Sequence, residues 1–201
     1  MIAAIILAAG DSTRMGSPKA LPAAPDGHAF VARLVRAFAA AGVSDVTVVT
    51  GREHEAIVAA VAADRPPLAA RFAVNPDPSR GQVSSLWTGL DAVMRPDLEA
   101  VLVTLVDVPM VRPATIRAVV DAWATARAPV VRPAIGERHG HPVLFDRALF
   151  DELRRAPLDE GAKAVVHAHA SEVVNVPVED EGPLLDVDTP ADYEALTRRE
   201  P

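Results

Sequence analysis

The sequence predicts an α/β protein of three layers, in which helices cover both faces of a mainly parallel sheet. Short apolar runs alternate along the chain with segments whose apolar residues recur at helical spacing. The apolar runs are unbroken, as expected of strands that are buried on both faces. Half of the 201 residues are apolar and 23% are charged, which suits a sizeable core. This length and the absence of a long linker predict a single domain over residues 1–201.

Strands and helices alternate in the first half of the chain. Ile2–Ala8 is a continuous apolar run and predicts the first strand. Ala29–Ala41 carries apolar residues at helical spacing and precedes Gly42, a residue type that commonly follows the end of a helix. The next elements are a strand at Val46–Thr50, a helix at Glu53–Ala62, a strand at Phe72–Val74 and a helix at Val83–Met94.

The second half continues the pattern. Val101–Val106 predicts a buried strand, and Pro113 suits the first turn of a helix that runs to Ala126. The remaining elements are strands at Val130–Val131, Val143–Phe145 and Val173–Val178, helices at Leu149–Arg155 and Glu160–Ala168, and a last helix that starts at Thr189–Pro190. Ligands of such sheets bind beyond the carboxyl ends of the strands, so the loops after the first strand and after Val106 are the candidate site.

Composition and charge exclude several functions. Lys and Arg total 20 against 27 Asp and Glu, and a net charge of −7 argues against a nucleic-acid partner, which requires a basic face. The absence of cysteine excludes thiol nucleophiles, cysteine zinc sites and disulfide scaffolds. The apolar N-terminal run is too short to cross a bilayer and has no basic flank, so no membrane association and a cytoplasmic location are expected.

The loop after the first strand carries the strongest functional signal. It reads Leu-Ala-Ala-Gly-Asp-Ser-Thr-Arg-Met-Gly-Ser-Pro-Lys over residues 7–19. Its small residues let the backbone N–H groups approach phosphate oxygens closely: Ala8, Ala9 and Gly10. Arg14 and Lys19 would neutralise a polyphosphate and stabilise a transferring phosphoryl group. The two glycines alone are ordinary strand-to-helix loop chemistry, but the whole string with both cations favours phosphate binding.

Two better-known phosphate loops do not fit this segment. A Walker A loop requires a second glycine where Met15 stands. The dinucleotide-binding pattern requires glycines where Ser12 and Met15 stand. Neither a P-loop ATPase nor a nicotinamide-dependent dehydrogenase is therefore supported.

Two acidic positions suit a divalent cation. Asp107 ends the strand at Val101–Val106 and would point into the crevice, although Asp is also common as a turn cap. Asp186 and Asp188 are two apart in an extended segment and would face the same side. Mg²⁺ is bound by one or two carboxylates together with phosphates and waters, which matches this set. Asp192 instead suits the first turn of the last helix.

The loop string resembles the signature Leu-Ala-Ala-Gly-x-Ser-x-Arg-Met-Gly-x-x-Lys of MobA-like nucleotidyltransferases, and within that family it is most similar to molybdenum cofactor cytidylyltransferases. The resemblance implies a Rossmann-like nucleotidyltransferase fold. It also implies that Lys19 and the loop residues contact a nucleoside triphosphate: Leu7, Ala8, Ala9 and Gly10. Ala9 implies CTP, because relatives that use GTP have glycine there. Asp107 and Asp188 resemble the family's Mg²⁺-binding carboxylates.

Further positions follow the family's order along the chain. Asp107-Val108-Pro109 matches an Asp-x-Pro element, but relatives that use CTP have Gln where Val108 stands, which removes a polar contact. Asn75 and Ser84 resemble positions beside the nucleotide, although Ser84 is equally suited to capping the helix it starts. His141, in Gly-His-Pro, resembles an acceptor-binding residue, although a lone histidine is more often structural.

The resulting expectation is a Mg²⁺-dependent enzyme in which an acceptor phosphate attacks the α-phosphate of CTP and pyrophosphate leaves. Arg14, Lys19 and Asp107 would be its catalytic residues, and the resemblance implies molybdopterin as acceptor and a molybdoenzyme or its chaperone as partner. The alternatives are guanylyl transfer from GTP, a sugar-1-phosphate acceptor, and a nucleotide-binding module without catalysis. Turnover of CTP with Mg²⁺ and candidate acceptors discriminates between the enzymes and the module.

Overall fold

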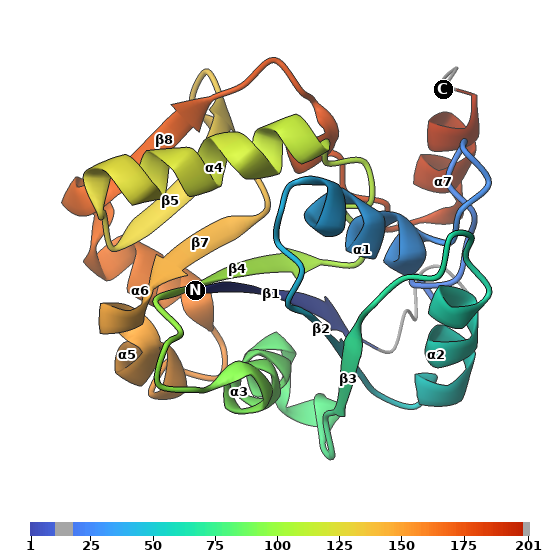
Figure 1. Ribbon diagram of the computed structural model, residues 1–201, viewed down its shortest axis with the longest axis horizontal. Coiled ribbons are helices and arrows are strands. Elements are labelled where there is room, and N and C mark those ends of the chain that lie inside the picture. The colour runs from blue at the N-terminus through green and yellow to red at the C-terminus, as the bar shows by residue number, and fades with distance from the viewer. Residues whose placement is uncertain (11–17, 199–201) are drawn as a thin grey trace.

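An eight-stranded sheet forms the centre of the protein, which is described here by a computed structural model over residues 1–10 and 18–198 (Figure 1). The strand order is β3-β2-β1-β4-β7-β5-β6, with β8 paired to β5. The strands are β1 (Ile2–Ala8), β2 (Val46–Thr50), β3 (Arg71–Val74), β4 (Ala100–Leu105), β5 (Val130–Ile135), β6 (Arg138–His139), β7 (Val143–Asp146) and β8 (Val173–Pro177).

The sheet is mainly parallel, which confirms the predicted fold class. β3, β2, β1 and β4 pair in parallel, as do β5 and β8. β7 is the exception, because it pairs antiparallel with both β4 and β5. The short β6, which the sequence analysis did not predict, also pairs antiparallel with β5. Its two exposed residues lack the apolar pattern by which buried strands are recognised.

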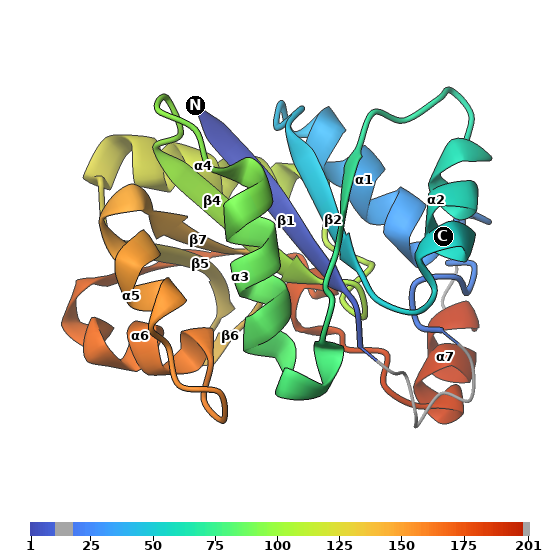
Figure 2. The same ribbon diagram turned by 90° about the horizontal axis from the view of Figure 1, so that it is seen from below.

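Helices cover both faces of the sheet (Figures 1 and 2). The residues buried on one face come from α1 (Phe30–Ala40), α2 (His54–Ala62), α4 (Pro113–Ala126) and α7 (Pro190–Thr197). Those on the other face come from α3 (Gln82–Val93), α5 (Phe150–Arg154) and α6 (Ala162–Ala168). Phe30 and Phe38 lie on the buried side of α1 and are fully enclosed. Each such side chain contributes about 2–3 kcal/mol through its burial.

Most element boundaries agree with the sequence-based prediction to within one or two residues. β5 extends four residues beyond the predicted Val130–Val131 because it pairs with β8 through Ala134, which the local apolar pattern does not reveal. α6 begins after Gly161, whose φ of 58° is a left-handed conformation that ends the preceding turn. In the described part of the chain, no helix is both long enough and apolar enough to cross a membrane.

A buried carboxylate joins the end of α2 to α1 and to the loop before it. Asp64 is 7% exposed and its Oδ1 lies 2.8 Å from Nη2 of Arg36 and 2.9 Å from Nδ1 of His28. Burial opposes ionisation of Asp64, but hydrogen bonds from Arg36 and from the backbone N–H of Arg65 outweigh it and lower the pKa of the carboxyl. The ionised form of Asp64 therefore stabilises the fold.

Replacing Asp64 by asparagine is expected to lower the free energy of unfolding by about 2 kcal/mol at pH 7, the scale of a hydrogen bond to a charged group. The deficit should shrink as the pH falls below about 4, because a carboxyl whose pKa is lowered by folding loses its contribution there. Urea denaturation at pH 7 and at acidic pH measures both quantities. Asp121→Asn, at an exposed position of α4, is the control and should cost less than about 0.5 kcal/mol. Equal losses at both pH values would contradict the proposed role of the charge.

Candidate functional site

The ends of β1 and β4 lie side by side at the carboxyl edge of the sheet. Because the two strands are parallel neighbours, the loops that follow them meet, and the N–H of Val106 donates to the carbonyl of Leu7 at 3.1 Å. Leu7, Ala8 and Ala9 are buried, whereas Gly10 is exposed. The structure therefore presents the start of the loop at the edge where ligands of such sheets bind. The predicted catalytic residue Arg14 lies outside the described residues.

Three of the predicted site residues meet in one cluster. Nζ of Lys19 lies 2.9 Å from Oδ2 of Asp107 and also forms an ion pair with Oδ1 of Asp188. The Lys19 and Asp107 side chains are 16% and 18% exposed, and Asp188 is 40% exposed. Lys19 is 88 residues from Asp107 and 169 from Asp188 along the chain. The fold thus assembles the cluster from three distant segments.

The ionisation of the cluster follows from its enclosure. Burial alone would lower the pKa of Lys19, but hydrogen bonds to Asp188 and Asp107 outweigh it and raise the pKa, so the amine stays charged. Burial, with the nearby charge of Asp107, raises the pKa of Asp186. The N–H of Val187 donates to the carbonyl of Asp107 at 2.8 Å and fixes the two acidic segments against each other. Asp186 is therefore a third carboxylate at this site that was noted in the sequence but not assigned a role.

The donor atoms of the cluster fit a divalent cation. Both carboxylates reach the same nitrogen of Lys19, so Asp107 and Asp188 lie close enough together that both would help to hold one divalent cation. Oδ1 of Asp107 is buried and has no hydrogen-bond partner within the described residues, so it retains a free lone pair for a metal. Ranges 1–10 and 18–198 contain no group of three or more His, Cys, Asp or Glu arranged to hold an ion. Phosphate oxygens and waters would have to complete the coordination, which is the usual arrangement for Mg²⁺.

Asn75 and Ser84 lie together beneath the start of α3. Asn75 is 4% exposed, and its Nδ2 donates to Oγ of Ser84 at 2.8 Å and to Oγ of Ser85 at 2.9 Å. Ser84 in turn donates to the carbonyl of Gly81. Both donor hydrogens of Asn75 are thus used within the protein, and the pair fixes the end of β3 to the first turn of α3. Their contact with a nucleotide stays a prediction.

His141 is held by a tight turn in a distant segment. Its backbone N–H donates to the carbonyl of Pro183 at 3.0 Å, in the 3₁₀ turn η4 (Gly182–Leu184). A Cβ on Gly140 would lie 2.2 Å from the same carbonyl oxygen, and one on Gly182 would lie 2.2 Å from the carbonyl oxygen of Met110. The turn is therefore wedged between the loop that follows Asp107 and the strand connection that carries His141.

Two further carboxylates fix the C-terminal segment. Asp180 accepts hydrogen bonds from the N–H of Arg112, the hydroxyl of Thr115 and the N–H of Gly182, and so connects the start of α4 to η4. Asp192 and Thr189 form a capping box at the start of α7, which confirms the structural role predicted for Asp192. These contacts set the position of the acidic segment that lies between them.

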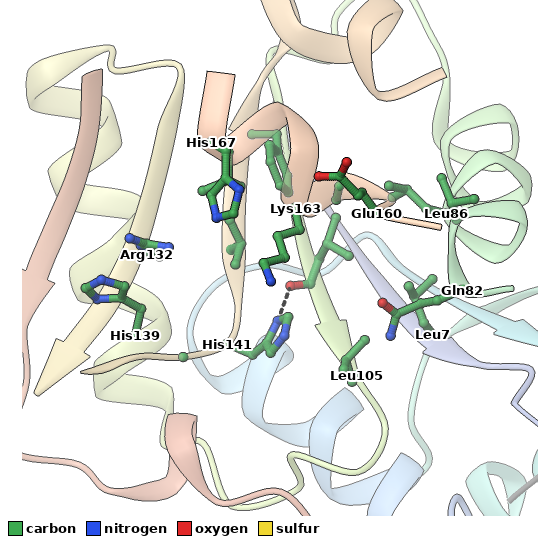
Figure 3. A pocket seen from close by; sticks show the side chains of 17 residues that line it. Leu7, Gln82, Leu86, Leu105, Arg132, His139, His141, Glu160, Lys163 and His167 are labelled. Atoms are coloured by element: carbon green, nitrogen blue, oxygen red, sulfur yellow. Dashed lines mark hydrogen bonds between the residues drawn. The ribbon is translucent and has the colours of Figure 1, made fainter. Parts of the chain in front are cut away.

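A pocket of about 570 Å³ opens beside His141 (Figure 3). Nδ1 of His141 lies 3.3 Å from the carbonyl of Val103, and burial lowers the pKa of the imidazole, so the ring is neutral. A neutral ring that donates through Nδ1 keeps a lone pair on Nε2. Leu7, near the end of β1, also lines the pocket, so the pocket extends to the edge of the sheet where the loop after β1 begins. Its other polar lining residues were not found from the sequence: Gln82, Arg132, His139, Glu160, Lys163 and His167.

The comparisons with known proteins place this chain in the class of nucleotidyltransferases. The sequence matches the MobA-like NTP transferase domain over residues 4–173. The chain therefore belongs to the MobA-like NTP transferase family, which confirms the family predicted from the loop string.

Solved structures of similar proteins share the whole fold. Rv0371c from Mycobacterium tuberculosis H37Rv is 28% identical, with 99% of each chain covered and a TM-score of 0.82. A structure of that protein in complex with manganese is 26% identical over 98% of this chain and 97% of the other, with a TM-score of 0.75. A divalent metal is thus bound by a protein of this fold.

A curated relative matches over a smaller part of its length. The bifunctional protein GlmU of Rhizobium etli is 33% identical over 147 residues, which are 73% of this chain and 31% of the relative. The chain thus spans less than a third of the length of that relative.

Proposed function

We propose that the protein transfers CMP from CTP to the phosphate of a molybdopterin acceptor, requires Mg²⁺ and releases pyrophosphate. The observation that carries this proposal is the cluster in which Lys19 bridges Asp107 and Asp188, at the edge of the sheet where the loop after β1 begins. A cation site built from two carboxylates beside a phosphate-binding loop serves phosphoryl and nucleotidyl transfer. The choice of CTP rests on Ala9 and on the resemblance to cytidylyltransferases.

The chemistry requires positioning and neutralisation of charge. An oxygen of the acceptor phosphate forms a bond to the α-phosphorus of CTP, the bond to the bridging oxygen breaks, and pyrophosphate carries the electron pair away. The attacking oxygen is already anionic, so no side chain has to remove a proton. Lys19 and Arg14 would neutralise the triphosphate and the leaving pyrophosphate. Asp107 and Asp188 would hold Mg²⁺, which when bound neutralises charge on the phosphate oxygens.

The pocket beside His141 would hold the acceptor. His141 offers its free Nε2 lone pair to a hydrogen-bond donor on that molecule, and its neutral ring adds no charge next to the acidic cluster. Leu7 lines the pocket and lies next to the loop residues that would bind the triphosphate. An acceptor in the pocket would therefore have its phosphate close to the triphosphate. The product would pass to a molybdoenzyme or its chaperone.

A thermal-shift panel of CTP, GTP, ATP and UTP, each with and without Mg²⁺, tests the nucleotide assignment. CTP with Mg²⁺ at 100 times its Kd should stabilise the protein by about 2.7 kcal/mol, because binding to the native state alone stabilises it by mass action. For a chain of this size that is a rise in Tm of about 5–10 °C. A larger shift with GTP would replace cytidylyl by guanylyl transfer.

Pyrophosphate release with candidate acceptors tests the reaction itself. Turnover of CTP should depend on Mg²⁺ and on molybdopterin. Turnover with a sugar 1-phosphate instead would replace the acceptor class. Tight binding of CTP without turnover for any acceptor would leave a nucleotide-binding module and contradict the proposed enzyme.

A further inference from the structure

We propose that the acceptor carries an apolar body and a second anionic group besides its reacting phosphate, and that Lys163 and Arg132 bind this second group in the pocket beside His141. The inference deepens the proposed function and rests on it for the identity of the acceptor. It assigns the far end of the pocket, for which the sequence suggested no role.

The lining of the pocket suits an apolar body. Val83 and Leu86 of α3, Val166 of α6, and Val103 and Phe145 from β4 and β7 line the cavity. These side chains belong to, or pack against, the hydrophobic core on this face of the sheet. Its volume of about 570 Å³ lies within the range of small-molecule sites.

Two cationic side chains, Lys163 and Arg132, line the far end of this pocket together with two histidines. Figure 3 shows Arg132, His139 and His167 on one side, and Lys163 next to them, extending from α6 toward His141. Only two of the chain's 20 basic residues are lysines, and they are Lys19 in the acidic cluster and Lys163 in this pocket. A protein with a net charge of −7 thus places two cationic side chains, Lys163 and Arg132, in the lining of one cavity.

Among the described residues, the two cations at this end of the pocket form no ion pair. Within ranges 1–10 and 18–198, neither Lys163 nor Arg132 has a carboxylate within 4.0 Å. Nε of Arg132 donates instead to Oδ1 of Asn175 at 2.8 Å, a contact that orients the guanidinium without cancelling its charge. Burial, with the charge of Arg132, lowers the pKa of His139, so His139 adds a polar contact rather than a charge. An anionic ligand would supply the missing counter-charge.

The opposite side of the pocket has a different character. Gln82 and Glu160 lie there, next to Leu86 (Figure 3). A carboxylate and an amide accept hydrogen bonds from N–H groups, so this side suits the nitrogen-bearing edge of a heterocycle. The two sides together would orient an asymmetric ring system, with its anionic group toward Lys163.

Fluorescence titration with pterin-6-carboxylate tests the inference without nucleotide, metal or turnover. This probe combines a flat heterocycle with one anionic group, and 6-hydroxymethylpterin is its uncharged counterpart. We expect the wild-type protein to bind the carboxylate form about tenfold more tightly, the effect of one charge-assisted hydrogen bond. Lys163→Gln and Arg132→Gln should each remove most of that preference, and Lys163→Arg should retain it. Arg138→Gln, on β6 but not lining the pocket, is the matched control and should bind like the wild type.

The outcomes separate this inference from the proposed function. Equal affinity for the two pterins, binding of neither, or an equal loss in Arg138→Gln and Lys163→Gln would overturn the inference. The nucleotide panel would be unaffected by any of these results. Conversely, a preference for the carboxylate that depends on Lys163 would stand even if the nucleotide proved not to be CTP.

Discussion

Replacing Asp107 by asparagine is expected to reduce the turnover of CTP about 1,000-fold, with little change in the free energy of unfolding. The amide keeps the shape of the carboxylate but removes the charge that would bind Mg²⁺. Oδ1 of Asp107 is buried and without a hydrogen-bond partner in the described structure, so it is the oxygen whose negative charge a metal would lose in this variant. The stabilisation of the protein by CTP should also lose its dependence on Mg²⁺. Pyrophosphate release and thermal shift measure the two effects.

The control for this variant is Asp121→Asn, which removes the same charge from an exposed position of α4. It should retain full turnover and the full response to Mg²⁺. Wild-type activity in Asp107→Asn would remove the proposed metal site, whatever the nucleotide.

Replacing Lys19 by methionine is expected to lower kcat about 100- to 1,000-fold, the usual effect of losing one group that stabilises developing charge. The free energy of unfolding of the variant should also be lower than that of the wild type by about 1–2 kcal/mol at neutral pH without metal. Lys19 is the cation between Asp107 and Asp188, so methionine leaves two carboxylates facing each other. Added Mg²⁺ should recover part of this stability, because it can bridge the same oxygens.

The conservative variant Lys19→Arg separates charge from geometry. Arginine keeps the positive charge and should preserve stability, but its planar group differs in shape from an amine and should restore turnover only in part. A methionine variant with unchanged kcat would contradict the proposed role of Lys19. A stability that does not respond to Mg²⁺ would contradict the shared cation site.

The fold and part of the acidic cluster were predictable because their signals are local. The unbroken apolar runs identified the parallel strands, and the strand at Val101–Val106 placed Asp107 at the carboxyl edge. Parallel neighbours end at the same edge, so the loop that contains Lys19 was expected near Asp107. The family resemblance added Asp188, which lies 169 residues from Lys19 and could not be paired with it by pattern.

The acceptor end of the site could not be predicted in the same way. Arg132 interrupts an apolar run, and its neighbour in space is Asn175, 43 residues away. Lys163 lies on a short helix that packs against α5. Each residue alone resembles a solvated charge, and only the tertiary structure brings them to one cavity. Asn75 was assigned to the nucleotide by the family resemblance; its amide hydrogens bond Ser84 and Ser85 inside the protein, and its contact with a nucleotide stays a prediction.

The wedged turn η4 has a consequence for chimaeras made between members of this family. It contacts Met110 on one side and Gly140 on the other with no room for an added carbon. If the segment that carries His141 were replaced by that of a relative, it would collide with η4 of this chain wherever the new segment has a side chain in place of Gly140. The collision would occur even if every new side chain suited the new ligand. Residues 180–188 are therefore best exchanged together with the segment that carries His141.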